Sequence, residues 1–327
     1  MNGYPAIRKQ SGLSLVELMV AVVLGLLLMT GIFSVFLASK QTYRLSDAVS
    51  RMQENGRFAL EMLASDIRMA GHQGCADPRL VQANAATAIS FSYPEDAVAG
   101  TEGGHGPDKI MVRYGTAEFG ELTSSMPSQA SEIAVSKVPH KLKDNGLALI
   151  ADCDSADIFS VSAGGLDRGN GRAHPGSALS RAYNHDNDAD DDARSAARLM
   201  GLETAEFEVK QTGRSNHAGN PVHALYREGE EVLEGVENLQ VKYGVRTGNQ
   251  VQYVDWSGSI DKENIISVRI GLLLHSIDPV LDADDEAEYA VAGVTIRPAP
   301  TGATGPTHGG DRRLRRVFET TVALRNR

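Results

Sequence analysis

The sequence predicts an α+β fold in which a long N-terminal helix packs on a β-rich C-terminal region. Three observations predict it. An apolar run occupies residues 13–38, an amphipathic pattern continues it to about residue 70, and short β-rich runs separated by turn residues fill the rest of the chain. No proline occurs between Pro5 and Pro78, so nothing forces a break in the helix.

The apolar run is long enough to cross a membrane. A hydrocarbon core of about 30 Å needs roughly 20 apolar residues in a helix, and no charged residue occurs from Leu18 to Ser39. Arg8 and Lys9 stand before the run. Because basic residues mark the cytoplasmic flank, we expect a single-pass inner-membrane protein whose N-terminus is cytoplasmic. Everything after Lys40 is then exported, as a periplasmic head.

Three interpretations of this run compete. A cleaved secretory signal has an apolar core of only about 7–15 residues, and ASKQTYR after the run is a poor cleavage site. A plain membrane anchor gives no role to Glu17, although a carboxylate in a membrane helix costs roughly 2.5–3.5 kcal/mol. The third interpretation, a processed membrane helix that keeps its acid for a function, accounts for both Gly12 and Glu17.

The heptapeptide GLSLVEL, residues 12–18, carries this third interpretation. It resembles the class III signal of type IV pilins and type II secretion pseudopilins. The resemblance implies that a prepilin peptidase cuts between Gly12 and Leu13 and removes the leader 1–12. It also implies that Leu13 is N-methylated and that Glu17 serves assembly. Leu13 departs from the phenylalanine that is usual at the first mature position.

The helix pattern changes character after the apolar run. Residues 13–39 form the transmembrane and assembly half, and residues 40–71 form an amphipathic half. Steps of three and four place one apolar stripe on this second half: Leu45, Val49, Met52, Gly56, Leu60, Leu63 and Ile67. Asn55-Gly56 is its weak point, which predicts either a kink or the close approach of a strand.

The remaining residues, 72–327, read as a β-rich head. Strand-like runs alternate with turn residues, beginning with TAISFSY, KIMVRY, EIAVSKV, LALIA and DIFSVS, and resuming with AEFEVKQ, HALYRE, ENLQVKYGVR, QVQYVD, IISVRIGLLLHS and YAVAGVTI. The glycine-rich segment 163–176 is predicted as a loop. A boundary near residues 163–200 divides the head into two lobes in one interpretation, and a single domain is the alternative.

The net charge limits the classes of function that the chain can have. The net charge of −10 argues against a broad nucleic-acid surface, which needs clustered Lys and Arg. The one basic run near the C-terminus comprises Arg312, Arg313, Arg315 and Arg316. We interpret it as the solvated start of a strand, so no nucleic-acid partner is expected.

Two acidic stretches are candidates for cation binding. Asp186, Asp188 and Asp190 have a spacing that can wrap a hard cation, but the glycine and glutamate of an EF-hand loop are absent from the required positions. We interpret this stretch as a solvated acidic loop, with a Ca²⁺ site as the alternative. The acidic stretch 282–288 receives the same interpretation.

No reactive motif stands out. The nine histidines do not pair at zinc-ligand spacing, and there is no G-x-S-x-G, P-loop or G-x-G-x-x-G after a strand. We therefore expect neither an enzyme nor a cofactor. Cys75 and Cys153 are the two cysteines. In an exported chain such a pair predicts a disulfide, with two buried thiols as the alternative.

Four later stretches narrow the resemblance: MQENGRFALEMLASDIRMAGHQGC, DCDSADIFSV, LEGVENLQVKYGV and RRVFETTVALRNR. They are similar to the PilW family of type IV pilus minor pilins. The resemblance implies a protein that primes pilus assembly in the inner membrane and is incorporated into the extracellular fibre at or near its tip. It implies as partners the other minor pilins, the major pilin and an adhesin-like tip protein. Both cysteines fall inside these stretches, which strengthens the expected bridge.

Three rival functions remain open at this stage. A J-type minor pseudopilin of type II secretion shares the general layout. A membrane-anchored periplasmic enzyme requires a reactive constellation that the sequence does not display. A DNA-uptake receptor requires an exposed basic surface.

Overall fold

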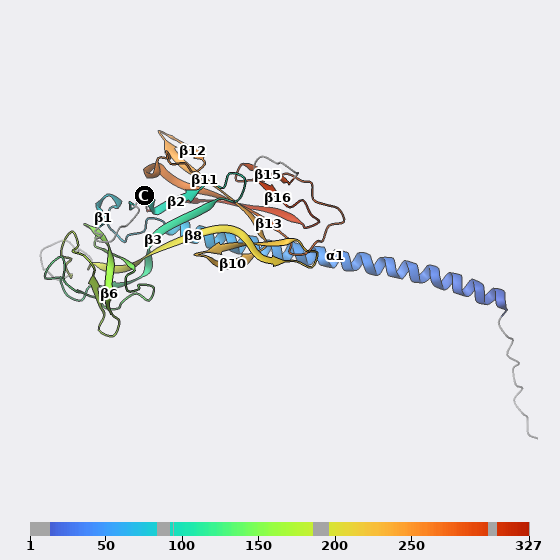
Figure 1. Cartoon of the computed structure of the whole chain (residues 1–327), viewed down its shortest axis with the longest axis horizontal. Coiled ribbons are helices and arrows are strands. Elements are labelled where there is room, and N and C mark those ends of the chain that lie inside the picture. The colour runs from blue at the N-terminus through green and yellow to red at the C-terminus, as the bar shows by residue number, and fades with distance from the viewer. Residues whose placement is uncertain (1–13, 84–91, 94, 186–195, 300–305, 327) are drawn as a thin grey trace, which may run out of the picture. The chain divides into compact units, whose positions relative to one another are not determined.

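The computed structural model describes residues 14–83, 92–93, 95–185, 196–299 and 306–326 (Figure 1). The chain divides into two compact units, residues 1–50 and 51–327. Helix α1 (Leu15–Met69) is continuous across this boundary. Its 55 residues correspond to about 82 Å of helix. The expected architecture, one long N-terminal helix packed on a β-rich region, is confirmed.

Local signals define both ends of α1. Ser14 Oγ accepts a hydrogen bond from Val16 N over 3.2 Å, which satisfies one of the free amides of the first turn. At the other end Gly71 adopts a φ of +77°, a conformation that glycine reaches without steric cost. Gly71 N donates to Arg113 O of β3 (Lys109–Glu121), so the chain leaves the helix directly onto a strand.

The head contains three sheets within its described residues. Ten strands form the first sheet: β1 (Val81–Ala83), β2 (Val98–Thr101), β3, β4 (Ile133–Ala134), β5 (Leu147–Ala151), β6 (Ala156–Asp167), β7 (Arg172–Pro175), β8 (Arg198–Ser215), β9 (Pro221–Arg227) and β10 (Glu230–Glu234). Their main order is β10-β9-β8-β5-β6-β7-β4, with β3 on β8, β2 on β3, and β1 parallel to β6.

The two other sheets are smaller. The second has the order β12-β11-β13-β17, from β11 (Val236–Thr247), β12 (Gln250–Val254), β13 (Ile265–His275) and β17 (Arg315–Ala323). The third joins β14 (Tyr289–Val291), β15 (Val294–Pro298) and β16 (Thr307–His308). Among the described residues three short 3-10 helices occur: η1 (Pro78–Leu80) before β1, η2 (Glu95–Ala97) before β2 and η3 (Lys262–Asn264) before β13.

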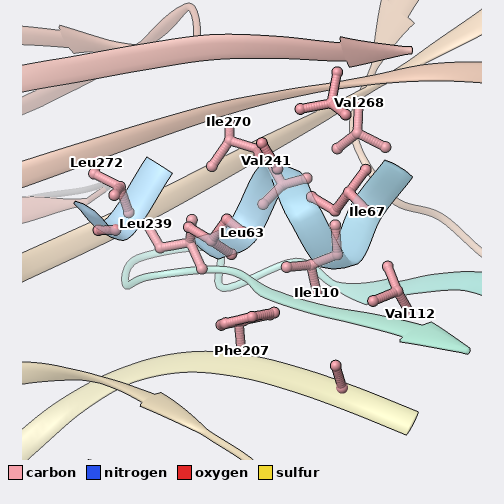
Figure 2. Close-up of a cluster of buried hydrophobic side chains, with 14 of the residues drawn as sticks. Leu63, Ile67, Ile110, Val112, Phe207, Leu239, Val241, Val268, Ile270 and Leu272 are labelled. Carbon is pink, nitrogen blue, oxygen red and sulfur yellow. The ribbon is translucent and has the colours of Figure 1, made fainter. Parts of the chain in front are cut away.

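The main core surrounds the last turns of α1. Leu63 and Ile67 are fully buried, and Figure 2 shows them between side chains of β11 and β13 on one side and of β3 and β8 on the other. The strand side chains labelled there are Ile110, Val112, Phe207, Leu239, Val241, Val268, Ile270 and Leu272. Burying each such side chain contributes about 1.5–3 kcal/mol. The amphipathic stripe of the helix therefore joins the first two sheets.

Gly56 allows β17 to approach the helix. A Cβ at this position would lie 2.7 Å from the Phe318 ring, and α1 continues through Asn55-Gly56 without a break. Of the two interpretations of this dipeptide, close approach is confirmed.

A second apolar cluster lies away from the helix. It contains Leu122, Met126, Ile133, Val135, Val138, Leu142, Ala148, Ile150, Phe159, Val161, Ala173, Leu179, Tyr183, Ala197 and Leu199. The long strand β8 contributes Leu199 to this cluster and Phe207 to the main core, so one strand is common to both.

The glycine-rich segment predicted as a loop is largely a hairpin, and that prediction was wrong. β6 runs on to Asp167, and Arg172 pairs with it at the start of β7. Asp167 Oδ1 accepts from Asn170 N over 3.0 Å, and Gly171 has a φ of +65°. The glycines thus form the turn and permit close approach between strands, rather than ending them.

Other strand predictions differ in extent. The run EIAVSKV forms only the two residues of β4, and YAVAGVTI is a hairpin, because Ala292 and Gly293 adopt positive φ values of 48° and 86°. Most of TAISFSY lies outside the described residues.

Candidate membrane-assembly site

The first half of α1 is an apolar surface. Every large hydrophobic side chain from Leu15 to Leu37 is at least 50% exposed. The helix is long and apolar enough to cross a membrane, by length and composition. Its few hydroxyl groups are satisfied internally, since Thr30 Oγ1 donates to Leu26 O and Ser34 Oγ donates to Gly31 O, each over 2.8 Å. Such bonds remove the penalty of placing a hydroxyl in hydrocarbon.

Glu17 lies in the first turn of α1 and is exposed. A carboxylate in the first turn interacts favourably with the positive end of the helix dipole. The backbone amides of the first turn therefore stabilise the Glu17 carboxylate locally, without a cation. The predicted cleavage residues Gly12 and Leu13 lie outside the described residues, so their geometry is not part of this site.

The predicted disulfide between Cys75 and Cys153 is confirmed. Their Cα atoms are 4.7 Å apart, and the bond joins residues separated by 78 positions. Cys75 follows α1, and Cys153 lies in the turn between β5 and β6. The bridge therefore ties the exit of the helix to the first sheet, beside a small apolar cluster that includes Ala76 and Ala151.

The metal candidates stay untested. Asp186, Asp188 and Asp190 lie outside the residues that the structure describes. Within the described ranges, no three His, Cys, Asp or Glu side chains are grouped so that they could hold a metal ion.

A polar clamp fixes α1 to the first sheet. Asp66 of the helix accepts from Arg227 Nε of β9 over 2.8 Å and from the Tyr114 hydroxyl of β3 over 3.0 Å. Arg227 also contacts Glu203 of β8 at 3.3 Å. Burial and the neighbouring Asp66 raise the pKa of Tyr114, so its hydroxyl remains a donor. The clamp holds the helix by directional bonds in addition to apolar packing.

A second polar cluster was missed in the sequence. Arg315, fully buried at the start of β17, contacts Glu237 of β11 at 2.7 Å, Asp285 at 3.2 Å and Asp311 at 3.0 Å. Arg313 is equally buried, and its Nε donates to Asp311 over 2.9 Å. We call these five side chains the arginine network. The network joins β11 and β17 to the segment before β14.

The arginine network overturns two interpretations made from the sequence. Arg313 and Arg315 are not at a solvated strand start; only their neighbours Arg312 and Arg316 are exposed. Asp285 is buried too, so the stretch 282–288 is not simply a solvated acidic loop. The sequence did contain a signal for this network. The two buried arginines have i, i+2 spacing, which places them on one face of an extended chain. A second signal for the network was the acidic residue Glu237, which lies within a run of buried strand residues.

His275, the last residue of β13, borders the arginine network. Its Nδ1 lies 2.9 Å from Ser276 O, so this nitrogen is the donor, and Nε2 accepts from Arg313 Nη1 at 3.1 Å. Burial is the main cause that lowers the pKa of His275 to about 4; the charge of Arg313 acts in the same direction, and Glu237 opposes the shift. The ring is therefore neutral near pH 7.

A cavity of about 490 Å³ lies beside the network. His223, Glu237, His308, Asp311 and Arg313 are among its lining residues. The positive and negative groups in its wall are largely paired with one another, so the cavity presents no uncompensated charge of one sign.

Comparison with known families finds two matching segments. Residues 213–326 match the family model described as type IV pilus-assembly protein W, and residues 7–33 match the prokaryotic N-terminal methylation motif. Over these two segments the chain is similar to type IV pilin-like proteins of the PilW family. Neither the comparison with curated proteins nor that with solved structures gives a match.

The two matches include most of the features described above. The methylation-motif match contains Gly12, Leu13 and Glu17, together with the start of α1. The PilW match begins near the end of β8 and contains the whole arginine network, β12 and the strand β17 that closes against the helix.

Proposed function

We propose that this protein is a minor pilin of the PilW family that primes or supports type IV pilus assembly and is incorporated at or near the pilus tip. The observation that carries the proposal is helix α1. Its first half is an exposed apolar surface with one acid, and its last turns lie in the core of the head. One continuous element thus links a membrane segment to a folded head, which is what incorporation into a fibre from the membrane requires.

The processing and partners belong to the same proposal. A prepilin peptidase cleaves between Gly12 and Leu13, Leu13 is methylated, and the head faces the periplasm. The other minor pilins, the major pilin and an adhesin-like tip protein are the partners in the fibre. Support for these roles comes from the methylation-motif match over residues 7–33 and the PilW match over residues 213–326.

Glu17 acts in this proposal through a neighbouring subunit. Cleavage creates a positive amine at Leu13, one helical turn before Glu17. In lipid, an acid persists by being protonated or by finding a cation. The Leu13 amine of an adjacent subunit is such a cation, and pairing with it sets the axial register between helices.

Complementation of a deletion strain tests the proposal. The wild-type chain restores pili, and Gly12→Val leaves a precursor about 12 residues longer, because a side chain at the cleavage site blocks the peptidase. A deletion strain with normal piliation would contradict the proposal, and a normal-size product from Gly12→Val would contradict the processing site.

Glu17→Ala separates the assembly helix from a plain anchor. The variant is expected to insert and be cleaved, yet to fail in piliation. Glu54→Ala, which removes an exposed acid from the amphipathic half of the same helix, is the matched control and is expected to assemble normally. A plain anchor predicts the opposite, since loss of Glu17 removes a transfer cost.

The second candidate is a J-type minor pseudopilin of a type II secretion system. The methylation motif alone does not separate it from a pilus subunit, whereas the PilW match favours the pilus. Detergent extraction and pull-down from the inner membrane separate the two. Recovery of other minor pilins supports the proposal, and recovery of secretion components supports the alternative.

A further inference from the structure

The cavity of about 490 Å³ beside the arginine network is lined by strands of all three sheets. β8 and β9 come from the first sheet, β11 from the second and β16 from the third, and they contribute Gln211, His223, Glu237, Asn238 and His308. Small-molecule sites in proteins are concave, have volumes of about 300–1,000 Å³ and often lie between packed units. The cavity has the size and the setting of such a site.

The wall of the cavity contains polar side chains that are almost completely buried. Four of them are no more than 7% exposed: Glu237, Asn238, His308 and Arg313. His308 is held at both ring nitrogens, since Nε2 lies 2.8 Å from Ala287 O and Nδ1 accepts from Gly310 N over 3.1 Å. Glu237 is held by Arg315 at 2.7 Å. These bonds fix the wall in position before any ligand enters.

The charges in the wall are paired within the protein. Arg313 Nε donates to Asp311 over 2.9 Å, and Lys210 pairs with Glu208 at 2.6 Å. The carboxylates that line the cavity are engaged by arginines in the same way. Burial lowers the pKa of His223, so its ring is neutral near pH 7. Among the described lining residues, therefore, an anion finds no unpaired cation and a cation finds no unpaired carboxylate.

Uncharged groups of the wall keep free hydrogen-bonding capacity. Within the described residues, the side chains of Gln211, Asn220 and His223 make no hydrogen bond. Asn238 Oδ1 accepts from Gln240 Nε2 over 2.8 Å, but Asn238 Nδ2 has no partner in this part of the chain, although the residue is only 1% exposed. Buried polar groups are normally satisfied. An unsatisfied amide in the wall of a cavity is therefore a position at which a ligand is bound.

The free groups define the chemistry of the ligand. Carboxamides and a neutral imidazole each offer both a donor and an acceptor, which is the pattern that a hydroxyl group also has. A ligand that satisfies several of them at once carries several hydroxyls and no charge. Pro107, Val209 and Pro221 supply the apolar part of the wall, against which the C–H groups of such a ligand pack.

We propose that this cavity is a binding site for a neutral sugar of one or two rings. Hydroxyls of the sugar bond to Asn220, His223 and Asn238 and displace water from the wall, and the paired charges of the arginine network form a rigid floor that selects against charged sugars. A charged ligand would have to give up water without gaining a counter-ion, which is costly. This function is additional to pilus assembly and does not depend on it.

Saturation-transfer NMR on the full-length chain tests the site. The protein is solubilised in lauryldimethylamine oxide, because maltoside detergents carry a sugar headgroup that would compete. The neutral probes are the methyl glycosides of glucose, galactose and mannose, with maltose and lactose, and the charged probes are glucuronate and glucosamine. The expected result is transfer to the ring protons of at least one neutral probe, with a Kd at least threefold lower than for either charged probe. Absence of transfer to every neutral probe, or tighter binding of a charged one, would overturn the proposal.

Matched variants locate the sugar in this cavity. Gln211→Ala and Asn220→Ala each remove a carboxamide that bonds to nothing else in the described head, so urea unfolding is expected to match wild type. Each should raise the Kd about three- to tenfold, the effect of losing one neutral hydrogen bond. Gln252→Ala, which removes an exposed carboxamide outside the cavity, is the control and should leave the Kd unchanged.

The outcomes also separate this inference from the proposed function. Equal Kd values for the two cavity variants, the control and the wild-type chain would place the sugar elsewhere and overturn the site. The measurements use purified chain, so that result leaves the role in pilus assembly standing. Normal piliation of a deletion strain contradicts the assembly role and leaves sugar binding standing.

Discussion

Arg227 and Asp66 stand 161 positions apart in the sequence, yet Arg227 Nε donates to Asp66 Oδ2 over 2.8 Å. Both side chains are mostly buried, at 24% and 16% exposure. Because Tyr114 donates to the other Asp66 oxygen, the carboxylate is satisfied on both sides. The helix is therefore fixed in rotation as well as in depth against the first sheet.

Removing the acid of this clamp should destabilise the head. Asp66→Ala leaves the Arg227 guanidinium half-desolvated without its main partner, so we expect a loss of about 2–3 kcal/mol in the free energy of unfolding. Urea unfolding of the detergent-solubilised chain, followed by fluorescence of the single tryptophan, Trp256, measures it. Glu231→Ala, which removes the partner of the more exposed Arg214, should cost less than about 1 kcal/mol. Equal losses for the two variants would refute the clamp.

Breaking the arginine network should cost more. Arg315→Met leaves Glu237 buried and uncompensated, with an expected loss of about 3–5 kcal/mol. Arg316→Met, at the exposed neighbouring position, should be nearly neutral. The double variant Arg315→Met with Glu237→Leu should recover part of the loss, since Asp285 is then the buried carboxylate that still lacks its cation. A double variant as unstable as Arg315→Met alone would show that packing, not charge, sets the cost.

Acid should weaken the head in two steps. The pKa of His275 is lowered to about 4 from an ordinary 6.5, so between these pH values the unfolded chain binds more protons than the folded one. Stability should fall by about 3 kcal/mol as pH drops through this window. Protonation would cost Nε2 its acceptor role and place a cation beside Arg313.

The second step concerns the carboxylates. Burial works to raise the pKa of Glu237, but the hydrogen bond and charge of Arg315 hold it at about 2. Arg313 does the same for Asp311, whose pKa is also about 2. Their contribution is present above pH 4 and is lost as pH falls toward 2. Unfolding free energies measured from pH 7 to 2 should show a shallower upper step in His275→Gln than in the wild-type chain.

The disulfide should stabilise the head through the unfolded state. A closed loop of this length contributes up to about 4 kcal/mol in the chain-entropy description. Cys75→Ser and Cys153→Ser should each lower stability, and the double variant should be no worse than either single one. Finding two free thiols by mass spectrometry in protein isolated from the periplasm would contradict the bridge.

Gly56 should show a coupled effect with Phe318. Gly56→Ala places a methyl group 2.7 Å from the ring, and overpacking of this kind costs about 1–3 kcal/mol. In combination with Phe318→Leu the clash is relieved, and the gain in helix propensity of about 1 kcal/mol should appear instead. Thermal unfolding of the single and double variants measures the coupling. Additive effects would mean that the two residues do not meet.

The sequence predicts the helix and most long strands because those depend on local pattern. The apolar run, the stripe ending at Ile67 and the missing prolines are visible in order along the chain. The bounds Leu15–Met69 fall within a few residues of that expectation. The disulfide could likewise be predicted, since two cysteines allow only one pairing.

The arginine network could not be predicted in the same way. Glu237, Asp285 and Arg315 are brought together by sheet register, which depends on the packing of the whole head. From the sequence alone a charged side chain is expected to be exposed, because the sequence does not show its buried partner. The hairpin at Gly171 was missed for a different reason, because glycine marks both loops and tight turns within a sheet.

The closure of α1 by the far end of the chain has a consequence for biogenesis. Asn326 Nδ2 lies 3.3 Å from Ala70 O, 256 positions away, and Val322 of β17 completes the core around the helix. Leu63 and Ile67 are made early and remain without their last partners until almost every residue of the head has been synthesised. Contacts of such long range form slowly, and the exposed stripe meanwhile attracts other apolar surfaces. Survival of the newly made subunit therefore depends on protection of that stripe until β17 arrives.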